Sequence, residues 1–221
     1  MVTDHLAAVL FDMDGTLVDS EKVWTVGLQE LAEHYGGELS ARARAAMVGG
    51  GADDTMAILH EDLDQPWRDP AYGAAWLDAR VAELFADGLD WLPGAQELIA
   101  AVRAAGLRSA LVTNTGRALA DIALRTIGAD NFDVVVCGDE VARVKPDPLP
   151  YVTAAKFLGL SPQECVVIED SPAGVRSAFG AGCVVVAVPN ELALEGTAEA
   201  SLVVASLLEL DVDRLRGLFL G

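Results

Sequence analysis

Two aspartates, Asp12 and Asp14, stand two residues apart directly after the apolar run of residues 7–11. Gly15 and Thr16 then turn the chain away. The pattern predicts a buried β-strand that ends in a turn, and ligands of open α/β sheets bind just beyond the carboxyl ends of such strands. Paired acids are costly to bury unless a metal ion or a reaction requires them. The pair therefore predicts Mg²⁺ chemistry, with one aspartate as nucleophile and the other as the acid–base group.

An Asp-x-Asp-Gly sequence also occurs in calcium-binding loops and in ordinary turns. A calcium loop of the EF-hand type requires a Glu at its twelfth position. Counting from Asp12, that position is Val23, so the calcium interpretation fails. A turn without chemistry stays the alternative for this motif taken alone.

The segment Thr113-Asn114-Thr115 follows a second apolar run and precedes a helical pattern. A hydroxyl at a strand end and the backbone N–H groups of a helix N-terminus together bind phosphate well. Thr113 and Asn114 are therefore candidate phosphate-binding residues. The alternative for this segment alone is that Thr115 only caps the helix that follows.

Lys145 is one of three lysines in the chain, and Pro146 and Pro148 follow it closely. Because proline stiffens the backbone, the ammonium group is expected to be held rigidly. Such a group can neutralise a phosphoryl group and a nearby carboxylate. An ordinary surface lysine in a proline-rich loop is the alternative for Lys145 taken alone.

Glu169 and Asp170 stand at the end of another apolar run. Acids at the end of a buried strand are poorly tolerated without a cation. Together with Asp12 and Asp14 they would form an oxygen-rich site of the kind that binds Mg²⁺. The alternative is a helix N-cap before Pro172, where Asp and Ser are favoured.

Short β-branched runs alternate with helical patterns along most of the chain. This alternation predicts an α/β fold with a doubly wound, Rossmann-like parallel sheet that helices cover on both faces. The expected strands span residues 7–11, 109–113, 134–137, 165–168 and 184–188, with a sixth at 202–205, and the expected helices span 95–105, 117–127, 148–158 and 173–181.

Residues 20–92 interrupt this alternation with helical patterns near 22–35, 41–47, 53–60 and 70–85 and no convincing strand. Connections inside α/β units are usually far shorter than this segment. We therefore expect an inserted helical cap domain of residues 20–92, and a core domain of residues 1–19 and 93–221.

The 221 residues are 52% hydrophobic and carry a formal net charge of −19, from 34 acidic and 15 basic residues. Such a composition is typical of a globular protein, and its acidity without a Lys/Arg cluster excludes nucleic acid and anionic membranes as partners. The three cysteines stand in apolar stretches and are expected to be reduced. With no signal peptide or membrane-spanning run, we expect a cytoplasmic protein, and a monomer is the simplest expectation.

The four motifs, in this order, resemble those of the haloacid dehalogenase superfamily of phosphotransferases. The resemblance covers essentially the whole chain, and a helical insert after the first motif is similar to the small cap of that superfamily. The amino-acid sequences of the last two motifs resemble those of the β-phosphoglucomutase-like and phosphoglycolate phosphatase-like branch. The matching residues are Asp12-Met13-Asp14-Gly15-Thr16, Thr113, Lys145 and Glu169-Asp170.

The resemblance implies that Asp12 attacks phosphorus and forms an aspartyl-phosphate. Asp14 would protonate the leaving alcohol and then activate water for the second step. The implied Mg²⁺ ligands are the carboxylates of Asp12 and Asp170 and the backbone carbonyl of Asp14, with Glu169 bound directly or through water.

The same resemblance implies that Thr113, Asn114 and Lys145 hold the phosphoryl oxygens, and that the cap closes over a small phosphorylated substrate. Two cap residues are candidate substrate contacts. Trp24 follows the first motif closely, and Gly50 belongs to a glycine turn that faces the site in relatives.

The expected function is that of an Mg²⁺-dependent phosphatase acting on a sugar phosphate or on phosphoglycolate. A β-phosphoglucomutase-like phosphomutase is the first alternative. Such mutases carry a His where this chain has Trp24 and an Arg at about the place of Ala52, so hydrolysis is favoured. A catalytically silent relative that binds a metabolite or a protein is the second alternative, and the four intact motifs weigh against it.

Overall fold

The computed structural model describes residues 5–48, 52–189 and 198–220. It contains a six-stranded sheet in the order β3-β2-β1-β4-β5-β6, and every neighbouring pair is parallel. The predicted doubly wound parallel sheet is therefore confirmed. The strands are β1 (Ala8–Phe11), β2 (Arg108–Val112), β3 (Val134–Val136), β4 (Cys165–Glu169), β5 (Val184–Ala187) and β6 (Leu202–Val203).

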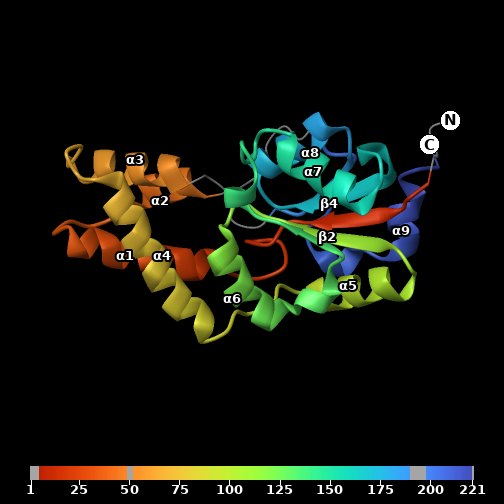
Figure 1. Ribbon diagram of the computed structural model, residues 1–221, viewed down its shortest axis with the longest axis horizontal. Helices are drawn as coiled ribbons and strands as arrows, with labels where there is room; N and C mark the ends of the chain where they lie inside the picture. The colour runs from red at the N-terminus through yellow and green to blue at the C-terminus, as the bar shows by residue number, and fades with distance from the viewer. Residues whose placement is uncertain (1–4, 49–51, 190–197, 221) are drawn as a thin grey trace.

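Helices cover both faces of the sheet, with α7 and α8 above it and α5 and α6 below it in Figure 1. Side chains of β1 alternate between the two faces, because Ala8 and Leu10 pack in one hydrophobic cluster and Val9 and Phe11 in the other. The strands are apolar throughout for this reason. The covering helices are α5 (Ala95–Ala104), α6 (Arg117–Ile127), α7 (Leu149–Leu158), α8 (Pro172–Ala181) and α9 (Val212–Gly217), with short 3-10 turns η1 (Ala129–Asn131), η2 (Gly138–Glu140), η3 (Pro162–Glu164) and η4 (Leu207–Glu209).

The register of the central strands aligns their carboxyl ends. Phe11 of β1 lies opposite Leu111 of β2 and Ile168 of β4. The residues that follow these three positions therefore meet at one edge of the sheet. This alignment brings together motifs that are more than a hundred residues apart in the chain.

Residues 21–86 contribute four helices that lie beyond this edge, at the left of Figure 1. Ser40 caps α2 through Ala43 N, and Asp69 caps α4 through Ala71 N, as expected for short polar side chains at helix starts. The helices are α1 (Glu21–His34), α2 (Ala41–Met47), α3 (Ala52–Asp62) and α4 (Pro70–Ala86). None of the helices in the described ranges is long and apolar enough to cross a membrane.

The two chain segments that connect these helices to the sheet run side by side. Asp19 N donates to Asp90 O at 2.9 Å, and Leu92 N donates to Leu17 O at 2.9 Å. The helical segment therefore leaves and rejoins the rest of the molecule at one place, next to the loop that carries Asp14.

Candidate active site

One cavity of about 600 Å³ lies between the carboxyl edge of the sheet and the four helices. Its lining includes most of the residues that the sequence singles out: Asp12, Asp14, Trp24, Thr113, Asn114, Lys145 and Asp170. Glu169 is fully buried and touches Lys145. Gly50 lies outside the described residues.

Lys145 connects three elements of the sheet edge. Its Nζ lies 2.6 Å from Asp12 Oδ1, 2.6 Å from Glu169 Oε1 and 2.8 Å from the carbonyl oxygen of Val112. The lysine is only 5% exposed, so it is not an ordinary surface lysine. Asn114 holds its backbone from both sides, because Lys145 N donates to Asn114 Oδ1 and Asn114 Nδ2 donates to Lys145 O.

Both oxygens of Glu169 are engaged by neighbouring side chains. Tyr151 donates its hydroxyl to Oε1 at 2.6 Å, and Ser171 donates its hydroxyl to Oε2 at 3.1 Å. Gly174 leaves the room that this carboxylate occupies, since a Cβ at that position would lie 1.9 Å from Glu169 Oε1. Glu169 is therefore fixed by its surroundings, and the first turn of α8 needs a glycine at position 174.

The acidic cluster carries more negative than positive charge. Asp12, Glu169 and Asp170 each place one carboxylate oxygen within 4.8 Å of the others. When all three carboxyl groups are ionised, the single ammonium of Lys145 balances one of them and two negative charges are left over. A divalent cation would neutralise them, and carboxylate oxygens are ligands that hard divalent cations prefer. The donor set therefore fits such an ion.

Burial and charge shift the pKa values in this cluster. Burial, together with the charges of Glu169 and Asp14, raises the pKa of Asp12 to about 8, although Lys145 opposes the shift. Burial and the neighbouring carboxylates also raise the pKa of Asp170 well above its usual range. Burial alone would lower the pKa of Lys145, but the charges of Asp12 and Glu169 raise it overall. The lysine is therefore charged, and the carboxyls of Asp12 and Asp170 are poorly ionised without a further cation.

Asp14 has different surroundings from the acidic cluster. Its Oδ1 accepts hydrogen bonds from Ser20 Oγ at 2.6 Å and from Trp24 Nε1 at 3.3 Å. Its Oδ2 accepts from Thr113 Oγ1 at 3.1 Å and from Thr115 Oγ1 at 2.8 Å. Four neutral donors from the sheet edge and from the start of the helical segment thus hold one half-buried carboxylate.

Sequence reasoning missed four contacts of this site. Thr115 was a candidate helix cap, but the residue before α6 is Gly116 and the Thr115 hydroxyl bonds Asp14. Ser171 caps α8 as the alternative reading expected, and it also donates to Glu169. Ser20 precedes α1 like a cap yet donates to Asp14, and nothing in the sequence near Tyr151 indicates its bond to Glu169.

Comparison with known proteins gives consistent matches over most of the chain. A family model described as haloacid dehalogenase-like hydrolase matches residues 6–182. Hexitol phosphatase A of Escherichia coli is 34% identical over 209 residues, which cover 93% of each chain. Phosphoglycolate phosphatase of Chromobacterium violaceum is 32% identical over 214 residues, which cover 93% of this chain and 95% of the relative. The crystal structure of CbbY from Rhodobacter sphaeroides in complex with phosphate has a TM-score of 0.79 at 28% identity, covering 93% of this chain and 96% of CbbY.

Proposed function

The chain belongs to the haloacid dehalogenase-like hydrolases and is a phosphoric monoester hydrolase, and we propose that it hydrolyses a small phosphorylated metabolite with Mg²⁺ as cofactor and Asp12 as nucleophile. The expected substrate is a sugar phosphate or phosphoglycolate, in line with the names of the two relatives. One observation carries the proposal. Asp12 lines the cavity and lies beside Lys145 and two further buried acids. Asp14 lies outside this acidic cluster and accepts hydrogen bonds from neutral donors.

Asp12 has one oxygen for positioning and one for attack. Its Oδ1 is bound to Lys145 Nζ, and its Oδ2 has no hydrogen-bond partner among the described residues. We assign the attack on phosphorus to Oδ2, which forms an aspartyl-phosphate and releases the alcohol. Lys145 and the Thr113 hydroxyl would then hold phosphoryl oxygens, and Asn114 would contribute its backbone N–H because its side chain is bonded to Lys145.

The cation would be held by the carboxylates of Asp12 and Asp170 and by the backbone carbonyl of Asp14. Glu169 fits a role outside the direct ligands of the cation, since both of its oxygens already accept hydrogen bonds. When bound, Mg²⁺ neutralises the charge of the phosphoryl group and orients it for in-line displacement.

Asp14 is proposed as the acid–base group. In the first step it protonates the oxygen of the leaving alcohol, and in the second it accepts a proton from the water that attacks the aspartyl-phosphate. The hydrogen bond that it accepts from the Thr115 hydroxyl keeps the carboxylate at the cavity wall between the two steps.

Residues 20–92 are proposed to act as a cap domain on a core of residues 1–19 and 93–221. The adjacent connectors at Asp19 and Leu92 give this segment one point of attachment, where a rigid-body movement would open or close the cavity. Closure would exclude bulk water during the first step and choose among leaving groups.

The proposal is tested by measuring phosphate release from a panel of phosphorylated metabolites, with Mg²⁺ and with chelator. We expect Mg²⁺-dependent release that Asp12→Asn abolishes. Asp64→Asn is the matched control, because Asp64 is exposed and its positive φ of 53° suits asparagine. Turnover by the Asp12 variant at the rate of the control would refute the nucleophile. Isomerisation of glucose 1-phosphate without phosphate release would indicate a phosphomutase instead.

A further inference from the structure

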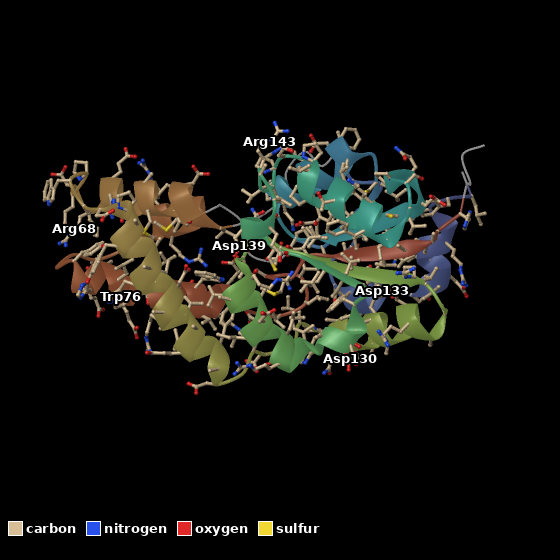
Figure 2. The ribbon with its side chains drawn as sticks, viewed as in Figure 1. Arg68, Trp76, Asp130, Asp133, Asp139 and Arg143 are labelled. Carbon is tan, nitrogen blue, oxygen red and sulfur yellow. The ribbon has the colours of Figure 1, made fainter. Side chains whose placement is uncertain are left out.

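Besides the residues around Asp12, the cavity lining comes from the four helices of the proposed cap and from α6 and η2 of the core. Carbon-rich side chains make up one portion of this surface: Trp24 and Leu28 of α1, Met47 of α2, Met56 of α3, Leu77 of α4 and Leu119 of α6. Four carboxylates make up another portion: Glu21, Asp54, Asp78 and Asp139. Figure 2 shows Asp139 where the helical segment meets the sheet-bearing part of the molecule.

Positive charge is scarce in the same lining. Lys145 and Arg44 are the only lysine or arginine residues among the described residues that line it. Residues 49–53, which include the undescribed part of the chain between α2 and α3, contain no Lys or Arg in the sequence. A second anionic group on a substrate, besides the phosphoryl group at Asp12, would therefore depend on Arg44.

Arg44 is already bound by groups of the cap itself. One guanidinium nitrogen lies 2.5 Å from Glu21 Oε2 and 3.0 Å from the Glu21 carbonyl oxygen. Its Nε donates to Thr25 Oγ1 at 2.7 Å. The two side chains are 12% and 7% exposed, so this ion pair is largely shielded from water. Withdrawing Arg44 to bind a ligand would break this largely buried ion pair, which is strongly unfavourable.

The lining thus offers hydrogen-bond acceptors and apolar surface, but little attraction for an anion. Carboxylates accept hydrogen bonds from hydroxyl groups, and apolar side chains pack on the carbon faces of a sugar. A carboxylate or a second phosphate on the leaving group would instead approach Glu21, Asp54 and Asp78, and like charges at close range oppose binding.

Resting on the proposed function, we infer that the leaving group is a neutral polyhydroxylated alcohol, and that Glu21, by pairing with Arg44, excludes substrates with a second anionic group. The substrate class is a sugar or sugar-alcohol monophosphate. Phosphoglycolate and sugar bisphosphates are selected against, because each brings a further negative charge to the cap side of the cavity.

The first test compares kcat/KM for a hexitol 6-phosphate and a hexose 6-phosphate with the values for phosphoglycolate and fructose 1,6-bisphosphate, in Mg²⁺ at low ionic strength. We expect at least one neutral-alcohol monophosphate to be preferred by about 30-fold or more, which is the scale of a single unfavourable charge contact. p-Nitrophenyl phosphate serves as a reference substrate for the core chemistry.

The second test changes the charge of the lining. Glu21→Gln removes the negative charge that faces Arg44 and should raise kcat/KM for phosphoglycolate about 10-fold relative to the hexitol phosphate. Glu33→Gln is the matched control, because Glu33 lies on the same helix and is exposed. If the Glu21 variant does not fold, the exposed Asp54 provides a second site, and Asp54→Asn should shift the same ratio by a few-fold.

Each result has a distinct meaning. Phosphoglycolate or the bisphosphate as the better substrate would overturn the inference. So would a substrate ratio in the Glu21 and Asp54 variants equal to that of Glu33→Gln, or hydrolysis of p-nitrophenyl phosphate with no preference among the metabolites. Absence of Mg²⁺-dependent release from every compound, p-nitrophenyl phosphate included, would overturn the proposed function and the inference with it.

Discussion

The indole Nε1 of Trp24 donates a hydrogen bond to Asp14 Oδ1 at 3.3 Å, and the same ring packs edge-on against Phe85 with centroids 6.2 Å apart. One side chain of α1 therefore contacts both the proposed acid–base group and α4 of the helical segment. An indole N–H donates a hydrogen bond but accepts none and does not titrate. Trp24 can thus orient the Asp14 carboxylate without taking its proton, which is the behaviour of a positioning residue.

Replacing Trp24 by Phe keeps an aromatic ring against Phe85 and removes the donor. A hydrogen bond of this kind contributes about 0.5–1.5 kcal/mol, so we expect kcat to fall about 3- to 10-fold while KM changes little. Steady-state kinetics across the pH range measure the effect, and a shifted pH profile of kcat would accompany the loss of positioning.

Trp76→Phe is the control for this variant, because Trp76 stacks on His34 at 5.4 Å and lies away from Asp139 on the outer part of the helical segment in Figure 2. A Trp24 variant that raises KM at constant kcat would show instead that the indole binds substrate in the way the sequence suggested.

Asp14→Asn tests the acid–base assignment by comparing leaving groups. With an alkyl phosphate we expect kcat to fall by about 10²- to 10⁴-fold, since the leaving alcohol needs a proton. With p-nitrophenyl phosphate the leaving group needs none, so one equivalent of nitrophenol should still appear in a burst before turnover stops. Equal losses for both substrates, with no burst, would contradict the assignment.

The core and its motifs could be predicted because they depend on local sequence patterns. Apolar runs define β1, β2 and β4, and parallel pairing then aligns their carboxyl ends by geometry alone. Asp12, Thr113 and Glu169 had to meet once those three strands were adjacent. Lys145 was ambiguous by itself, and only its burial against two carboxylates shows that it belongs to the site.

The contacts that could not be predicted depend on how helices pack at long range. Arg44 stands in an alanine- and arginine-rich helix and has the sequence context of a solvated charge. It meets Glu21, which is 23 residues away, only because α2 folds back over the start of α1. The Tyr151 bond to Glu169 likewise depends on the seating of α7 on the sheet, which no local pattern encodes.

Gly174→Ala should displace the buried Glu169, which lies close to the proposed nucleophile Asp12. The added Cβ would lie within 2.0 Å of both oxygens of Glu169, and both groups are fixed, so we expect a loss of about 3 kcal/mol in the free energy of unfolding. Urea denaturation measures this loss, and Mg²⁺ affinity should weaken with it.

Gly180→Ala in the same helix is the matched control, because its nearest neighbour, Pro148 Cβ, would lie at a comfortable 3.6 Å. Since Ala is the better helix former, this variant should gain about 0.5–1 kcal/mol. Equal stability of the two variants would mean that Glu169 does not occupy the space beside Gly174.

Affinity for Mg²⁺ should rise with pH up to about 8, because burial raises the pKa of Asp12 to that value from an ordinary 3.8 and the cation must displace the proton. Each pH unit below 8 should weaken binding by up to about 10-fold for one displaced proton.

The stability of the metal-free protein should change with pH in the opposite direction. Its native state binds more protons than the unfolded chain between pH 4 and 8, so the free energy of unfolding falls as pH rises through this window. Calorimetric titration of Mg²⁺ and thermal unfolding in chelator from pH 5 to 8.5 measure the two trends. Asp12→Asn should make the unfolding trend shallower, and the part that remains belongs to Asp170, whose pKa is also raised. An Mg²⁺ affinity that does not change between pH 6 and 8 would exclude a protonated Asp12.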